Sequence, residues 1–189
     1  MANTSQQFDK VARRCHQLFS HKLQDYGAAW RIMRLPSLTD QIFIKAQRLR
    51  TLEQAGKQMI ADKPEDEYIG IFNYAAIALV QLRKGIAEQP DIKATQALEL
   101  YEKEVGEAKA LMLKKNHDYG EAWRDMRMES LTDLILQKLL RIKQIEQNKG
   151  KTVASEGLAA NYADMLNYAA FALIKIDEKQ TLKEKEKTS

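Results

Sequence analysis

The sequence predicts an all-α protein of six main helices, arranged as two tandem three-helix units that pack about an internal pseudo-twofold axis. The composition supports helices and a buried core, because 44% of the 189 residues are hydrophobic and only 8 Gly and 3 Pro can interrupt a helix. Apolar residues recur at helical spacing. An unusual phrase also occurs twice, as DYGAAWRIMR at 25–34 and DYGEAWRDMR at 118–127.

A shift of 93 positions extends this match over most of the chain. SLTDQIFIKAQRLRTLEQ from Ser37 aligns with SLTDLILQKLLRIKQIEQ from Ser130. After one inserted residue, YIGIFNYAAIALVQL from Tyr68 aligns with YADMLNYAAFALIKI from Tyr162. We therefore interpret the chain as a tandem duplication, which is the usual meaning of such self-similarity.

The duplication divides the chain into four parts: a first repeat (1–84), a linker that contains Gly and Pro (85–95), a second repeat (96–178) and a charged tail expected to be disordered (179–189). Neither repeat can bury its apolar stripe alone. We therefore expect a monomer that acts as its own dimer, or a homodimer of such chains.

Each repeat is predicted to contain three helices. The first ends at the Gly of DYG, which suits a helix C-terminus. The second begins at SLTD, where Ser37 or Ser130 would cap the helix and Asp40 or Asp133 would complete a capping box. The third carries the NYAA motif.

Composition and charge exclude several classes of protein. A single cysteine, Cys15, excludes a disulfide framework, and no stretch is long and apolar enough for a signal peptide or a membrane span. We expect a cytoplasmic protein without a membrane partner. Because 30 basic residues are mixed with 26 acidic ones, charge does not indicate binding to duplex nucleic acid, but it leaves small anionic ligands open.

Two cations interrupt the apolar stripe of the second helix in each repeat. Lys138 falls in the middle of the stripe with Arg141 at its edge, and Lys45 and Arg48 repeat the arrangement. A buried lysine requires a negative partner. Two explanations stay open: each lysine pairs with a carboxylate inside the bundle, or the cations line an anion-binding cleft. The repetition in both copies favours the cleft.

The third helices differ between the repeats at one possible catalytic position. Asn161 and Asp164 share one side of the helix in the second repeat, and Glu67 and Gly70 stand at their positions in the first. Only the second repeat therefore has a carboxylate at the Asp164 position. We expect that both repeats could bind an anion and that only the second could carry out metal-assisted chemistry.

The repeated aromatic residues have two interpretations. Tyr119 and Trp123 could cover helix ends, which is the commoner role of such rings. They could also stack on a flat base while Arg124 contacts phosphate oxygens. RNA binding through the Arg and Trp pairs is a weaker possibility, because the net charge is only +4.

Several motifs together resemble a known family. KKNHDYGEAW, the pair Lys138 and Arg141, ASEG with Glu156, and NYADMLNYA with Asp164 and Asn167 resemble the nucleotide modification associated domain of the first type. The resemblance covers both repeats and implies a role in a nucleotide-modification context. The first repeat departs from the pattern at Gly70 and lacks a clear counterpart of Glu156.

A fainter similarity is to the MazG-type all-α nucleoside triphosphate pyrophosphatases, on the phrase NYADMLNYAAFAL. Those enzymes hold magnesium with two acidic pairs at helical spacing. Here one pair is reduced to Asn161 and Asp164, and Glu104 and Glu107 are better explained as a solvated face. Magnesium is a possible cofactor, with Asp164 and Glu156 as its ligands.

The sequence therefore predicts a protein that binds a nucleotide or related phosphate compound and could hydrolyse or otherwise process it, although enzymatic activity stays open. Asp164 and Asp118 are the predicted catalytic carboxylates. The predicted ligand contacts are Lys138, Arg141, Tyr119, Trp123, Arg124, Asn161, Asn167, Lys45 and Arg48. The alternative is a non-enzymatic helical interaction module, in which the same polar residues form an internal network that fixes helix register.

Overall fold

A computed structural model describes residues 4–55, 63–149 and 157–188, and in these residues every regular element is a helix. The predicted all-α class is therefore confirmed. The six main helices are α1 (Thr4–Tyr26), α2 (Leu35–Ala55), α3 (Pro64–Lys84), α4 (Ala94–Tyr119), α5 (Met128–Gln147) and α6 (Leu158–Thr188). Two short 3-10 helices, η1 (Ala29–Ile32) and η2 (Ala122–Asp125), follow α1 and α4.

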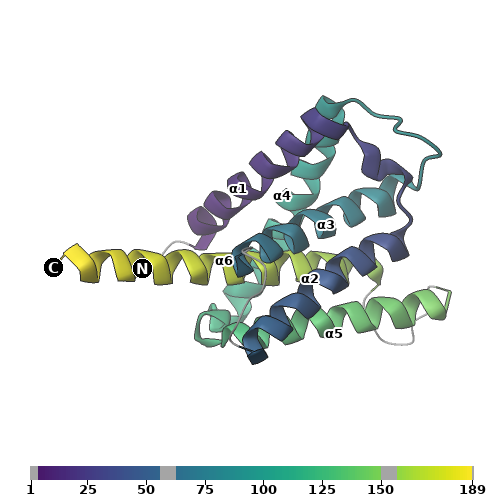
Figure 1. Ribbon diagram of the computed structural model, residues 1–189. Coiled ribbons are helices and arrows are strands. Elements are labelled where there is room, and N and C mark those ends of the chain that lie inside the picture. The colour runs from purple at the N-terminus through teal and green to yellow at the C-terminus, as the bar shows by residue number, and fades with distance from the viewer. Residues whose placement is uncertain (1–3, 56–62, 150–156, 189) are drawn as a thin grey trace.

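The helices form three layers, and each layer contains the same helix of both repeats (Figure 1). α3 and α6 lie against one another in the middle, α2 and α5 cover one side, and α1 and α4 cover the other. The two repeats therefore share one core, as their inability to bury an apolar stripe alone predicts.

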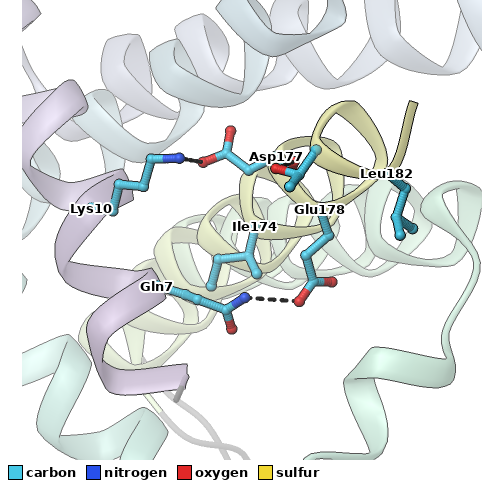
Figure 2. Close-up of a pocket in the computed structure, with 7 residues that line it drawn as sticks. Gln7, Lys10, Ile174, Asp177, Glu178 and Leu182 are labelled. Carbon is cyan, nitrogen blue, oxygen red and sulfur yellow. Dashed lines mark hydrogen bonds and ion pairs between the residues drawn. The ribbon is translucent and has the colours of Figure 1, made fainter. Parts of the chain in front are cut away.

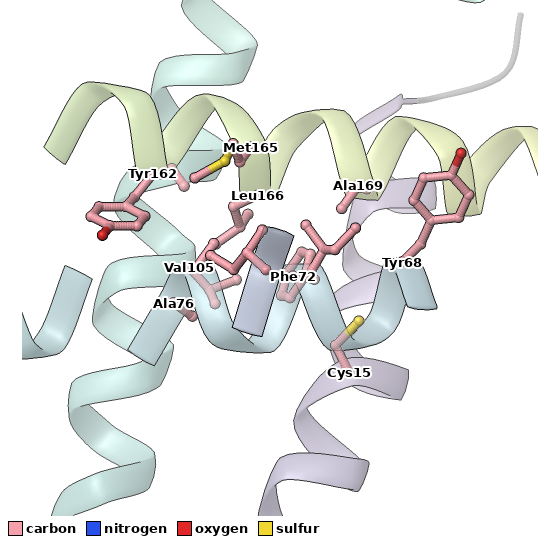
Figure 3. Packing of buried hydrophobic residues seen from close by; sticks show 14 of the residues in the cluster. Cys15, Tyr68, Phe72, Ala76, Val105, Tyr162, Met165, Leu166 and Ala169 are labelled. Carbon is pink, nitrogen blue, oxygen red and sulfur yellow. The ribbon is translucent and has the colours of Figure 1, made fainter. Parts of the chain in front are cut away.

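The middle layer is almost completely buried over residues 67–81 of α3 and 161–174 of α6, where both helices are apolar on nearly all sides. Figure 3 shows Phe72 and Ala76 of α3 beside Leu166 and Ala169 of α6, while Val105 of α4 reaches the same cluster. Small alanine side chains on both helices let the backbones approach closely. The NYAA motif places two buried alanines on each of these helices, Ala75 and Ala76 on α3 and Ala169 and Ala170 on α6.

The helix ends agree only partly with the prediction. Gly27 and Gly120 have positive φ values of 59° and 63° at the ends of α1 and α4, as the DYG motif predicts. The predicted serine caps are wrong, because α2 begins at Leu35 and α5 at Met128. Ser37 and Ser130 therefore lie inside the first helical turn, where backbone bonds to Arg34 and Arg127 already start each helix.

The last segment also differs from its expected form. Residues 179–188 continue α6 past the rest of the molecule, and the side chains of 179–187 are exposed (Figure 1). The segment lacks Gly and Pro, and its Lys and Glu residues are good helix formers that can pair at helical spacing.

Two hydroxyl pairs join the repeats at related positions. Thr39 of α2 lies 2.7 Å from the hydroxyl of Tyr162 in α6, and Thr132 of α5 lies 2.9 Å from that of Tyr68 in α3. Thr132 corresponds to Thr39 and Tyr162 to Tyr68 in the repeat alignment. All four side chains are buried. These crossed contacts are the signature of an internal pseudo-twofold axis.

A glutamate completes each hydroxyl pair. The Thr132 hydroxyl donates to Glu53 at 2.6 Å, and the Thr39 hydroxyl lies 3.4 Å from Glu146. We call the groups Glu53–Thr132–Tyr68 and Glu146–Thr39–Tyr162 the interface clusters. Burial raises the pKa of both glutamates, because a carboxylate loses hydration between the helices.

A second pair of polar contacts fastens the middle layer to the α1 and α4 layer. The Asn73 amide donates to the Cys15 carbonyl at 3.1 Å, and the Asn167 amide donates to the corresponding Ala108 carbonyl at 3.0 Å. The Tyr101 hydroxyl donates to the side-chain oxygen of Asn73 at 2.6 Å. The position that corresponds to Tyr101 in the repeat alignment is Phe8 of α1, which has no hydroxyl to offer Asn167. The side-chain oxygen of Asn167 has no hydrogen-bond partner among the described residues.

The first prediction concerns Glu53. Because its pKa is raised in the folded protein, the folded state binds this proton more tightly than the unfolded chain does. The stability that the group contributes is therefore present at low pH and is lost as the pH rises from the unfolded value, about 4.3, through the folded pKa. Glu53→Gln removes this ionisation and keeps an acceptor for Thr132, so we expect it to stabilise the protein near neutral pH.

Urea unfolding at several values between about pH 4 and 7 measures this effect. The gain in stability over the wild type should grow as the pH rises. Glu99→Gln, at an exposed position on α4, is the control for loss of a carboxylate. A Glu53→Gln protein whose pH dependence matches that of the wild type would contradict the role given to the Glu53 proton.

The second prediction concerns Phe8→Tyr. The new hydroxyl should reach the side-chain oxygen of Asn167, as Tyr101 reaches that of Asn73, and should raise the free energy of unfolding by about 1 kcal/mol. Tyr101→Phe is the matched reverse change, and we expect it to destabilise the protein because it leaves Asn73 without this donor. Chemical denaturation of both variants tests the idea, and a Phe8→Tyr protein less stable than the wild type would refute it.

Candidate functional site

The buried lysine of α5 has a carboxylate partner inside the protein. Lys138 is 7% exposed, and its ammonium lies 2.6 Å from one side-chain oxygen of Asp164 on α6. Asp164 is itself 5% exposed. A lysine on this apolar stripe is expected either to pair with a carboxylate inside the bundle or to line an anion-binding cleft. The contact that Lys138 makes is the internal pair.

A second lysine completes this group. Lys115 of α4 donates to the other oxygen of Asp164 at 2.7 Å, and its side chain is 42% exposed. We call Lys115, Lys138 and Asp164 the second-repeat cluster. Lys115 belongs to the KKNHDYGEAW motif, but its contact with Asp164 could not be predicted, because periodicity does not reveal which residue of a third helix faces Asp164.

The first repeat builds a related group with its carboxylate one helical turn earlier. Glu67 of α3 is 5% exposed and lies 3.1 Å from the Lys45 ammonium and 2.6 Å from the Arg48 guanidinium. We call these residues the first-repeat cluster. The Asp164 position is Gly70 here, but Glu67, at the position of Asn161, supplies the negative charge.

Gly70 has a steric role in this exchange. A Cβ atom at Gly70 would lie 2.4–2.9 Å from the end of the Lys45 side chain, which is closer than van der Waals contact. The missing side chain therefore lets Lys45 lie across α3 and reach Glu67. The corresponding lysines of the two repeats, Lys45 and Lys138, therefore pair with carboxylates at different positions of the third helix.

The remaining predicted residues on α4 and α5 lie at the surface. Asp118 and Tyr119 are exposed at the end of α4, and Asp118 lies 3.2 Å from His117. Arg141 is exposed on α5, one turn beyond Lys138. Asp118 likewise follows Lys115 by one turn. Asp118 and Arg141 therefore lie on α4 and α5, each one turn after a lysine of the second-repeat cluster.

Trp123 and Arg124 are engaged within the protein. The Trp123 ring is buried and stacks on Phe171, with ring centres 4.2 Å apart and planes 4° from parallel. The Arg124 guanidinium lies 4.4 Å from the centre of the Trp123 ring. Arg124 also donates hydrogen bonds to Thr4, Gln7, Glu121 and Glu178. These contacts favour the structural interpretation of both side chains.

The two predicted asparagines are also buried. The Asn161 amide donates to the Gly157 carbonyl at 2.9 Å, at the start of α6. Asn167 binds the backbone of α4, as described above. Both side chains therefore make contacts that position α6.

The predicted metal ligands are only partly described. Glu156 lies outside the described residues, and within them no group of at least three His, Cys, Asp or Glu side chains is arranged to hold a metal ion. Both oxygens of Asp164 contact lysine ammonium groups, which would repel a divalent cation. A magnesium site at Asp164 stays a prediction that depends on Glu156.

A cavity of about 470 Å³ lies away from both clusters, between the start of α1 and the second half of α6 (Figure 2). Its wall contains Ile174 and Leu182, together with the paired side chains of Lys10 with Asp177 and of Gln7 with Glu178. None of the predicted ligand contacts lines this cavity.

Comparison with known proteins gives one positive result. The comparisons with curated proteins and with solved structures gave no match. Among the described helices, none has the length and apolar character needed to cross a bilayer. The family model of nucleotide modification associated domain 1 matches residues 22–82 and 115–176, one segment in each repeat and more than half of the chain in total. The chain therefore belongs to this family and contains its domain twice.

Proposed function

We propose that the protein binds a nucleotide or a related phosphate compound at the second-repeat cluster. The observation that carries this proposal is the convergence of two lysine ammonium groups on Asp164, one buried and the other on a side chain that is 42% exposed. A ligand can approach such a cluster through Lys115, and phosphate oxygens are suitable acceptors for ammonium donors. The family's description adds a link to nucleotide modification.

In this proposal Lys115 and Lys138 contact phosphate oxygens while Asp164 orients the two ammonium groups. Arg141 and Asp118, each one turn away on α5 and α4, complete the polar rim, and the exposed ring of Tyr119 is available to contact a base. If the protein processes its ligand, Asp164 is the proposed catalytic carboxylate, because its partners are single lysine ammonium groups on flexible side chains rather than a rigid guanidinium.

The first-repeat cluster is proposed to bind an anion without carrying out chemistry. Glu67 contacts Arg48 at 2.6 Å, and a guanidinium stays protonated at any physiological pH. Glu67 is therefore held in part by a permanent cation, whereas the partners of Asp164 are two lysine ammonium groups. The two repeats are therefore expected to differ in activity although both keep two cations.

The second candidate function is a non-enzymatic helical interaction module. The observation that favours it is that Lys45 and Lys138 are each met by an internal carboxylate at ion-pair distance. In that case the clusters fix how the helices pack, and ligands are irrelevant. Replacing a buried pair as a whole is then tolerated, whereas removing one partner is costly.

A thermal-shift experiment distinguishes the two functions. Nucleotides added to the full chain, with and without magnesium, should raise the melting temperature, by an amount that corresponds to about 2.7 kcal/mol at a ligand concentration 100 times Kd. Lys115→Ala should lose most of this shift. Lys22→Ala changes the exposed, corresponding lysine of the first repeat and should keep it. The interaction module would instead show no shift with any phosphate compound and a stable Lys138→Met, Asp164→Asn double variant.

The asymmetry between the repeats requires two matched measurements, ligand affinity and product formation, on variants shown to be folded. Asp164→Asn should abolish turnover, because the amide cannot act as a base. Lys45→Ala should weaken binding in the first repeat and leave turnover in place. Full turnover by Asp164→Asn in an otherwise active protein would show that the asymmetric assignment is wrong.

A further inference from the structure

The connection between the repeats is fixed to the first repeat by a buried arginine. Arg31 of η1 is 2% exposed, and its guanidinium donates to the Asp91 carboxylate at 2.7 and 3.2 Å and to the Gly85 carbonyl at 2.7 Å. Both partners belong to residues 85–93, the non-helical linker between α3 and α4. One side chain therefore holds the two ends of the linker together.

The backbone of Arg31 contributes to the same contact. Its carbonyl accepts a hydrogen bond from the Ala87 amide at 3.0 Å and another from the Gln81 side chain at 3.0 Å. The bidentate contact with Arg31 lowers the pKa of Asp91, so the pair stays charged over the physiological range. We call Arg31, Asp91 and the Gly85 carbonyl the linker clamp.

The corresponding arginine of the second repeat has a different task. Arg124 contacts Thr4, Gln7 and Glu178, which lie on α1 and α6. It holds no connecting segment, because α6 continues as a helix where α3 gives way to the linker. Because η2 packs without contacting a linker, such a short helix does not need a linker clamp in order to pack. The particular effect of the clamp is to fold the linker back onto the first repeat.

The contacts between the repeats do not depend on the two repeats belonging to one chain. Each repeat supplies one threonine, one tyrosine and one glutamate to the interface clusters, and each layer contains one helix from each repeat. The first repeat of one chain and the second repeat of another could make all of these contacts. Exchange of identical elements in this way is a low-cost route to a dimer, and it depends on the segment that connects them.

We infer that the surface between the repeats can bind a second copy of this chain, and that the linker clamp keeps the protein a monomer. With the clamp closed, the second repeat is held near its own first repeat at a high effective concentration. With the clamp open, the nine residues of the linker can extend over about 30 Å, enough to direct the second repeat to another molecule. The product is a domain-swapped dimer with the same core.

The test compares full-length variants after unfolding and refolding at high protein concentration. Arg31→Gln and Asp91→Asn open the clamp, and Arg124→Gln is the matched control at the corresponding arginine. Size-exclusion chromatography with light scattering should show monomers for the wild type and Arg124→Gln, and a dimer fraction several times larger for both clamp variants. Asp91 lies at the surface with 41% of its side chain exposed, so Asp91→Asn decides the outcome if Arg31→Gln does not refold.

Cross-linking then identifies the surface that forms the dimer. Asp40 of α2 and Lys143 of α5 lie 3.3 Å apart across the repeat interface, so Asp40→Cys with Lys143→Cys and a short bis-maleimide report on that interface. Cys15 is buried, and burial raises its pKa to about 12, which keeps it unreactive near neutral pH. In the swapped dimer the cross-link joins two chains and gives a covalent dimer on a denaturing gel.

Three results would overturn the inference. The first is that both clamp variants remain monomers. The second is a dimer in which the cross-link stays within single chains, because another surface then forms it. The third is that all of the proteins, including the wild type and Arg124→Gln, form swapped dimers to the same extent.

Discussion

The contact between α3 and α6 is the constraint on which the rest of the structure depends. Over residues 67–81 of α3 and 161–174 of α6, each helix is buried on nearly all of its sides, so it must be covered from several directions at once. One three-helix unit has only two other helices to offer. The second copy supplies the missing cover, and this explains why the two repeats form one core in three layers rather than two separate bundles.

Polar groups are placed where this apolar core reaches its limits. The interface clusters lie between the α2 and α5 layer and the middle layer, and the asparagines of the NYAA motifs bind the other outer layer. Buried polar groups of this kind must be satisfied, so they select one register of the helices among those that hydrophobic packing would permit. The crossed arrangement makes each repeat contribute to both interface clusters.

The two ion clusters show how a duplicated unit can diverge while a carboxylate still meets the lysine of each apolar stripe, which is buried at Lys138 and half-buried at Lys45. Glu67 with Gly70 and Asn161 with Asp164 are two solutions to the same problem, because a carboxylate can approach the lysine from either of two adjacent turns. The position of the carboxylate also decides its second cation. Asp164 contacts Lys115 of α4, whereas Glu67 contacts Arg48, which lies on α2 together with Lys45. This difference therefore changes the chemistry available to each repeat while leaving the fold unchanged.

The sequence by itself determined the helical class, the duplication, the DYG helix ends and the family, because these depend on local periodicity, backbone preference and repeated letters. It also predicted that Lys138 needs a negative partner and that Asp164 is a candidate for it. Only the tertiary structure decided that these two side chains meet, that Lys115 joins them, that Glu67 replaces the missing aspartate, and that Trp123 and Arg124 are engaged within the protein. The reason is physical: periodicity tells which side of a helix is buried, but a contact between helices depends on their register, their crossing and the length of each side chain.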